Sequence, residues 1–278
     1  MRKIKIAADS SCDLFELKQT ELTCAPMKII TKEQEFVDDP LLDIESMVNY
    51  LYQYKGKSKS SCPNTADWLD AFGDADEVFC VTITSSLSGS YNSACAAKQI
   101  YETENEGKRV HVFNTFSAGP ELTLIVEKIE ECINMGMSFE EIRDNVTAYM
   151  EKTGLLFMLK SLKNFANNGR VSPIVAKLVG IAGICIVGKA SNKGTLEPIH
   201  KCRGERLSLQ TLVDELGREG FNLGKISIGH CQNEAGAEQL KDMIQAKYKN
   251  AKIEIHKFRG LCSFYAEKGG ILMGFEKA

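Results

Sequence analysis

The sequence lacks an apolar run long enough to cross a membrane. Its longest such run, residues 178–188, has 11 residues, whereas a membrane-spanning helix needs about 20. It also lacks a lysine- and arginine-rich stripe with interleaved aromatic residues, and its net charge is −3, so we expect no nucleic-acid partner. The start of the chain meets an acid at Asp9, too soon for a signal peptide. We therefore expect a cytoplasmic protein whose contact with membranes is at most transient.

Sequence motifs for metals, nucleotides and serine hydrolysis are also missing. None of the 10 cysteines have C-x-x-C spacing and the four histidines form no H-E-x-x-H pattern, so we expect no metal and no disulfide framework. There is no G-x-x-x-x-G-K-[ST] loop for nucleotide phosphates and no G-x-S-x-G turn for a nucleophilic serine. Cys80, Cys185 and Cys231 lie in or next to strand-like runs, where we expect small buried side chains.

What the chain does have is a concentration of small hydroxyls at residues 84–94, which read Thr-Ser-Ser-Leu-Ser-Gly-Ser-Tyr-Asn-Ser-Ala. This stretch follows an apolar run and leads into a predicted helix. The first N–H groups of a helix and its dipole favour an anion at such a turn. Because the turn holds no lysine, arginine or histidine, it favours a weakly charged group such as a carboxylate over a phosphate. The alternative is that Ser88 only caps the helix, as serine often does.

The order of apolar patterns predicts an α/β fold in two parts. Strands and helices alternate in the first half, which is typical of parallel βαβ units. The second half has strands in pairs, including a hairpin turn at residues 192–194, which indicates an α+β arrangement with a mixed sheet. We predict a Rossmann-like parallel-sheet domain over residues 1–153 and an α+β domain over residues 154–278. The predicted strands are residues 3–8, 24–30, 36–39, 78–83, 110–114, 155–159, 183–187, 195–199, 225–230, 252–258 and 269–275. The predicted helices are residues 43–54, 65–72, 93–100, 118–135, 139–152, 161–167, 173–180, 207–219 and 234–248.

Several residues leave other functions open. A group of acids could support metal-assisted chemistry or simply cap turns in solvent: Asp9, Asp13, Asp38 and Asp39. Ser88 or Ser86 could be the nucleophile of a serine-dependent hydrolase or another small-carboxylate-processing α/β enzyme, with His230 as its best candidate base. Arg170 could bind a head group or lie on the surface. A protein scaffold without any ligand is the third alternative.

Several blocks, in this order along the whole chain, resemble the DegV family. The chain opens with a strand that ends in Asp-Ser-Ser-Cys-Asp-Leu, and residues 85–94 are similar to the family's Ser-Ser-x-Leu-Ser-Gly-Thr-Tyr-Gln-Ser-Ala turn. Other blocks that look like the family's are Lys-Ser-Ser-Cys-Pro-Asn at 59–64, Asn-Thr-Phe-Ser-Ala-Gly at 114–119, Asn-Gly-Arg-Val-Ser at 168–172 and Lys-Cys-Arg-Gly at 201–204. The resemblance implies a long-chain fatty acid in a tunnel between two domains. It also implies a non-catalytic subunit that presents the carboxylate to a separate fatty acid kinase, which makes acyl phosphate.

The resemblance also implies roles for particular residues. Ser88 would be the central carboxylate donor, and Arg203 would contact the kinase. Ala266 stands where the family has a histidine, so that contact would be either missing or replaced by Tyr265 or by Lys268 as a cation. The complete set of expected head-group residues is Ser60, Ser61, Ser86, Ser88 and Gly89, with Arg170, Tyr265 and Ala266 as further candidates. Residues 155–159, Ile181, Ile184 and Ile186 could line the tunnel or belong to the ordinary core.

Overall fold

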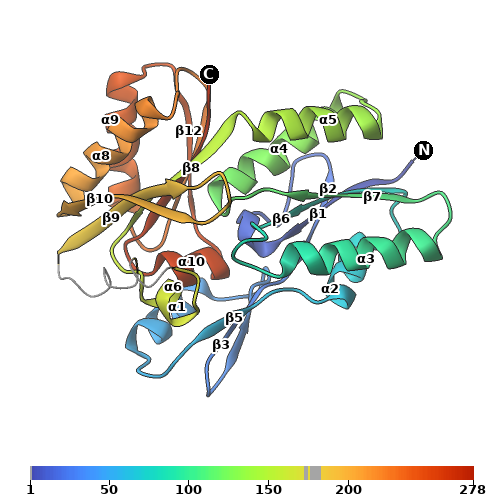
Figure 1. Cartoon of the computed structure of the whole chain (residues 1–278), viewed down its shortest axis with the longest axis horizontal. Coiled ribbons are helices and arrows are strands. Elements are labelled where there is room, and N and C mark those ends of the chain that lie inside the picture. The colour runs from blue at the N-terminus through green and yellow to red at the C-terminus, as the bar shows by residue number, and fades with distance from the viewer. Residues whose placement is uncertain (1, 172–174, 176–182) are drawn as a thin grey trace.

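The computed structural model describes residues 2–171, 175 and 183–278. A four-stranded parallel sheet, sheet A, occupies one side of the molecule, with the order β2-β1-β6-β7 (Figure 1). Its strands are β1 (Ile4–Asp9), β2 (Glu21–Ala25), β6 (Glu77–Thr82) and β7 (Arg109–Asn114). The central strands β1 and β6 are almost entirely buried, as expected where helices cover both faces of a parallel sheet, whereas the edge strand β2 is mostly half-buried.

Four helices cover sheet A. Helices α2 (Thr65–Phe72) and α3 (Ser90–Glu104) pack on one face, and α4 (Pro120–Asn134) and α5 (Phe139–Met150) pack on the other. A capping box of Ser138 and Glu141 begins α5, the helix predicted over residues 139–152. Helix α4 also contacts strands of the second large sheet, so it lies between the two halves of the molecule.

The second large sheet, sheet C, has six strands in the order β10-β9-β8-β13-β11-β12. All neighbours are antiparallel except β11 and β12, which are parallel. Helices α8 (Glu205–Arg218) and α9 (Glu234–Lys247) share an apolar core with it. Its strands are β8 (Thr153–Leu159), β9 (Ile184–Ala190), β10 (Leu196–Arg203), β11 (Lys225–His230), β12 (Lys252–Lys257) and β13 (Ile271–Glu276).

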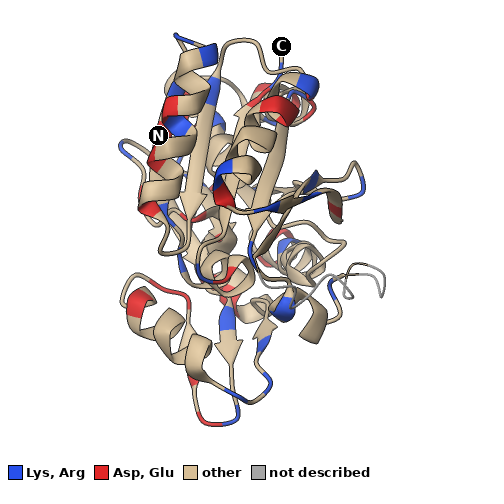
Figure 2. Ribbon diagram, turned by 90° about the vertical axis from the view of Figure 1, so that its left-hand side faces the viewer, with Lys and Arg blue, Asp and Glu red and all other residues tan. Residues whose placement is uncertain are grey.

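A small antiparallel sheet, sheet B, projects at the lower end of the molecule beside α1 (Ile44–Gln53) (Figure 2). It consists of β3 (Lys28–Ile30), β4 (Glu35–Val37) and β5 (Lys59–Ser61) in the order β4-β3-β5. Three short helices, η1 (Ser10–Cys12), α6 (Lys163–Asn167) and α10 (Gly260–Ala266), lie where the three sheets approach one another (Figure 1).

The structure confirms the predicted fold class, a parallel α/β sheet combined with a mixed sheet. The single strand predicted over residues 24–30 is wrong, because Pro26 separates β2 in sheet A from β3 in sheet B. Proline has no N–H to donate to a ladder, so a break there is physically reasonable. Residues 59–61, where no strand is predicted, form β5. The helix predicted over residues 173–180 lies outside the described residues.

Helix α10 is the one element along residues 183–278 that the sequence analysis missed. Almost all of its residues are buried, so it has no amphipathic stripe to recognise. Among the residues that the structure describes, no helix is both long and apolar enough to cross a membrane. The domain limits of residues 1–153 and 154–278 remain a prediction.

Candidate functional site

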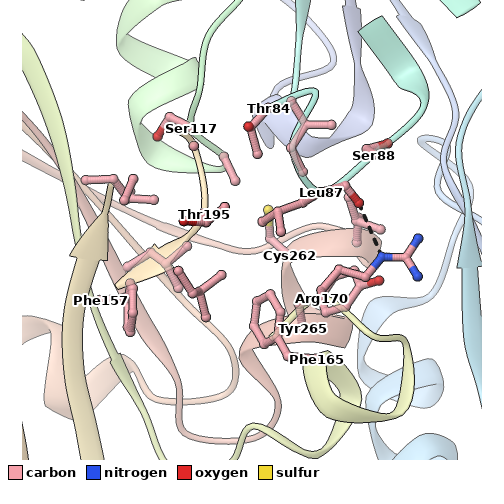
Figure 3. Close-up of a pocket in the computed structure, with 18 of the residues that line it drawn as sticks. Thr84, Leu87, Ser88, Ser117, Phe157, Phe165, Arg170, Thr195, Cys262 and Tyr265 are labelled. Atoms are coloured by element: carbon pink, nitrogen blue, oxygen red, sulfur yellow. Dashed lines mark hydrogen bonds between the residues drawn. The ribbon is translucent and has the colours of Figure 1, made fainter. Parts of the chain in front are cut away.

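A cavity lies between sheets A and C, and its wall is mostly apolar (Figure 3). It encloses about 930 Å³ of space between atoms, part of it open to solvent. The described residues that line it are Met27, Ser60, Cys62, Ile83, Thr84, Leu87, Ser88, Gly89, Phe116, Ser117, Ala118, Leu155, Phe157, Leu159, Phe165, Arg170, Lys189, Ala190, Gly194, Thr195, Leu196, Leu261, Cys262, Tyr265, Ala266 and Leu272.

The serine-rich loop between β6 and α3 is held in place by Asp9, the last residue of β1. The buried Asp9 carboxylate accepts hydrogen bonds from the Ile83 amide at 2.9 Å and from the Ser90 hydroxyl at 2.6 Å. Burial raises the pKa of Asp9, although these bonds act in the opposite direction. Because Asp9 accepts hydrogen bonds from both ends of the loop, Ser88, which lies between those ends, is held at the cavity wall. The Ser88 hydroxyl also accepts a bond from the Ser90 amide at 3.2 Å, so it contributes to capping α3 as well.

Helix α10 forms another part of the wall, and two distant acids hold its N-terminus. Asp38 accepts hydrogen bonds from the amides of Gly260 at 2.7 Å and Leu261 at 2.8 Å. Asp13 accepts one from the Arg259 amide at 2.7 Å. Burial raises the pKa of Asp38, and it raises the pKa of Asp13 to about 8. These acids are thus structural partners of a helix that presents four side chains to the cavity: Leu261, Cys262, Tyr265 and Ala266.

One part of the cavity wall combines several hydroxyls with a guanidinium. The Ser60 hydroxyl, on β5, lies 2.7 Å from the Tyr265 hydroxyl, and burial raises the pKa of Tyr265. Arg170 follows α6, and its Nε donates to the Leu87 carbonyl at 3.2 Å (Figure 3). Figure 3 shows Ser88 and Arg170 on one side of the cavity and Phe157 on the other. Hydroxyls and a guanidinium in one part of the wall of an apolar cavity suit an elongated molecule with one anionic group.

The structure brings together six of the expected head-group residues and separates the others. The six that line the cavity are Ser60, Ser88, Gly89, Arg170, Tyr265 and Ala266. Ser61 and Ser86 are both exposed and are not among the lining residues, and the Ser86 hydroxyl donates instead to the Lys193 carbonyl at 2.5 Å. Lys268 is exposed too, with its ammonium 5.6 Å from the ring centre of Tyr52. Arg203 lies outside the cavity, in a separate hollow beside Arg206.

The groups proposed for catalysis are not arranged for it in the described part of the chain. The carboxylates of Asp9, Asp13 and Asp38 are buried and bound to backbone amides, which corrects the expectation that such acids lie in solvent. No cluster of three potential metal ligands occurs among the described residues. His230 accepts a bond from the Asn233 amide at 3.2 Å and does not line the cavity. The described lining residues include no histidine, aspartate or glutamate that could act as a base for Ser88.

Sequence reasoning found part of the apolar wall. Along β8, Leu155, Phe157 and Leu159 face the cavity, whereas Leu156 and Met158 point into the core of sheet C. The alternation of strand side chains could have separated the two sets. Ile184 and Ile186 do not line the cavity, and Ile181 lies outside the described residues. Lining residues that the sequence analysis missed include Thr84, Phe116, Ser117, Thr195 and Cys262.

Comparison with known proteins places this geometry in a family. A sequence model of the DegV family, described as uncharacterised proteins, matches residues 3–277. A DegV domain-containing protein of Streptococcus pneumoniae strain R6 is 45% identical over 276 residues, which cover 98% of each chain.

Solved structures are similar over the same length. A DegV family protein from Eubacterium eligens, loaded with heptadecanoic acid, is 44% identical with a TM-score of 0.96, and the match covers 99% of this chain and 100% of that one. The fatty acid kinase B3 protein of Streptococcus pneumoniae, loaded with linoleic acid, is also 44% identical, with a TM-score of 0.97 and complete coverage of both chains. The chain therefore belongs to the DegV family.

Proposed function

We propose that this protein binds one long-chain fatty acid in the cavity between sheets A and C. The observation that carries the proposal is a mostly apolar cavity that has the hydroxyls of Ser60, Ser88 and Tyr265 and the guanidinium of Arg170 in its wall. Two relatives that are 44% identical over essentially the whole chain are structures loaded with heptadecanoic acid and linoleic acid. In this proposal the cavity lies between a parallel-sheet domain of residues 1–153 and an α+β domain of residues 154–278.

Apolar burial supplies the affinity. Each buried methylene contributes about 0.8 kcal/mol, so an acyl tail of ~15 methylenes offers roughly 12 kcal/mol before the cost of ordering it. The side chains that would contact the tail include Leu155, Phe157, Leu159 and Leu272. Hydrogen bonds at the polar part of the wall then set the orientation of the ligand and select a carboxylate over other groups.

The carboxylate contacts are assigned to the polar part of the wall. Ser88 is the central donor, and Ser60 and Tyr265 form a hydroxyl pair beside it. Arg170 supplies positive charge in the same part of the cavity wall. Since alanine occupies position 266, the phenol of Tyr265, one residue earlier on α10, takes over part of the polar contact in this proposal.

The protein itself is proposed to be a binding subunit and not a catalyst. The described lining residues include no histidine, aspartate or glutamate to activate a serine, which favours binding over hydrolysis. A separate kinase would provide ATP, and a carboxylate oxygen of the bound fatty acid would attack the γ-phosphorus, with ADP as the leaving group. Arg203, exposed and outside the cavity, is the proposed kinase contact. A cytoplasmic location follows from the need for ATP, and it agrees with cysteines that are all unpaired.

The test is a titration of protein freed of lipid. Linoleic acid and its methyl ester have the same tail, but only the acid carries a carboxylate. We expect saturable one-to-one binding of the acid and at least tenfold weaker binding of the ester. Equal affinity for both would refute the carboxylate site, and no binding of either would refute the proposed ligand class.

A further inference from the structure

The tip of the β9–β10 hairpin, residues 190–196, extends beyond the sheet to which it belongs. Strand β10 is at the edge of sheet C, and the pairing of β9 with β8 ends where Lys189 meets Leu156. Past that point the tip has no further strand beside it in the described part of sheet C. Figure 1 shows the hairpin reaching from sheet C toward the strands of sheet A.

This hairpin tip covers part of the cavity. Four of its residues line the wall: Ala190, Gly194, Thr195 and Leu196. It closes against loops of sheet A with little space to spare, since a Cβ atom at Gly194 would lie 2.0 Å from the Thr84 hydroxyl oxygen and 2.9 Å from the Phe116 Cα. The Ser86 hydroxyl donates to the Lys193 carbonyl at 2.5 Å, which joins the tip to the serine-rich loop.

The surface that receives the tip is unusual. Phe116 has a φ of 53°, in the left-handed region that bulky residues rarely adopt. It lines the cavity and yet is 45% exposed, so it lies where the cavity meets the solvent. Backbone strain of this kind persists where surrounding structure enforces it, often at sites that clamp a ligand.

The tip is internally stiff, but its base is irregular. The Ser191 carbonyl accepts a bond from the Gly194 amide at 2.8 Å, and the Ser191 and Thr195 hydroxyls lie 2.8 Å apart. Below the tip, the pairing of β9 and β10 shifts register between Pro198 and His200. A bulge interrupts the ladder locally and lets a strand bend. A stiff tip on such a base can move as one body.

We propose that the hairpin tip is a hinged flap that gates the exchange of the acyl ligand. The hydrogen bond from Ser86 to Lys193 is its latch, and Phe116 and Thr84 form the surface on which it closes. The inference rests on the proposed function, because the gated cargo is the fatty acid. It makes Ser86 the donor that holds the flap closed, whereas the family resemblance suggested a head-group contact.

A latch and a ligand contact have different kinetic effects. Weakening a latch that closes the empty and the loaded cavity equally raises the association and dissociation rates by the same factor. The affinity, which is their ratio, then stays constant. Removing a contact with the carboxylate raises the dissociation rate alone and lowers the affinity.

The test measures both rates by stopped-flow fluorescence with cis-parinaric acid as the probe. Ser86→Ala removes the latch, and Ser93→Ala, in α3 and outside the cavity, is the matched control. We expect Ser86→Ala to speed both rates by about 3- to 10-fold, as loss of one neutral hydrogen bond predicts, with affinity within twofold of the wild type. The control should match the wild type.

A second variant, Gly194→Ala, places a methyl group against Thr84 and should also raise both rates. If it does not fold, Ser86→Ala still decides. Unchanged rates in Ser86→Ala would overturn the flap, and a faster dissociation alone would make Ser86 a ligand contact. If the wild type binds no parinaric acid, the proposed function fails first, and the flap loses its cargo.

Discussion

Asp13 provides a prediction that can be worked out from the structure. It lies after η1 with φ 59° and ψ 13°, and one of its carboxylate oxygens accepts a bond from the Arg259 amide. The other oxygen is buried beside the Cys262 thiol, without a nitrogen or oxygen partner among the described residues. Burial, with a smaller contribution from Asp38, raises the pKa of Asp13 from 3.8 to about 8, against the opposing effect of Arg259.

The sign of the pH effect follows from this raised pKa. Between about pH 4 and pH 8 the folded state keeps a proton that the unfolded state has lost. Burying Asp13 therefore costs no stability below about pH 4. Between about pH 4 and pH 8 it lowers the free energy of unfolding by about 1.4 kcal/mol for each pH unit. Asp13→Asn removes this dependence and keeps the acceptor for Arg259, and asparagine tolerates the left-handed backbone.

Urea unfolding followed by circular dichroism at pH 5, 6 and 7 tests this reasoning. From pH 5 to pH 7 the Asp13→Asn variant should gain roughly 3 kcal/mol relative to the wild type. Asp144→Asn is the control, because Arg143 lowers the pKa of that exposed carboxylate and its titration lies below this range. Parallel stability curves for the wild type and Asp13→Asn would show that Asp13 titrates alike in both states and refute the account of its burial.

Three further predictions concern the polar part of the cavity wall and the proposed kinase contact. Ser88→Ala should raise the dissociation constant for linoleic acid by about 10- to 100-fold in a fluorescence titration while Ser93→Ala does not, and retained affinity would refute the head-group assignment. Tyr265→Phe removes the partner of the Ser60 hydroxyl and should lower the free energy of unfolding by about 1 kcal/mol in urea; an unchanged value would mean that this pair adds nothing to stability. Arg203→Ala should bind linoleic acid normally but reduce acyl phosphate formation at least tenfold with a fatty acid kinase catalytic subunit and ATP, whereas weaker fatty-acid binding would assign Arg203 to the pocket.

The elements that sequence reasoning found are those with local signals. Periodic apolar residues and the Ser138 capping box indicate α5, and an unbroken apolar run marks β6. The loop that carries Ser88 was recognisable because its hydroxyls adjoin a strand and a helix that both have clear patterns. Local patterns of this kind also sufficed for the fold class.

The parts that were missed depend on contacts between distant residues. Helix α10 is capped by Asp38, which is more than two hundred positions away, and no local pattern reveals that bond. Ser60 and Ser61 are chemically alike, but only Ser60 lines the cavity, because neighbouring residues of β5 face opposite ways. The role of Ser86 depends on the Lys193 carbonyl, which a hairpin from the other half of the chain provides.

Native mass spectrometry of the protein as purified tests the central claim most directly. The account predicts a one-to-one complex whose added mass is a long-chain fatty acid, identified after lipid extraction. Protein that carries no lipid and takes up no added linoleic or heptadecanoic acid would contradict it.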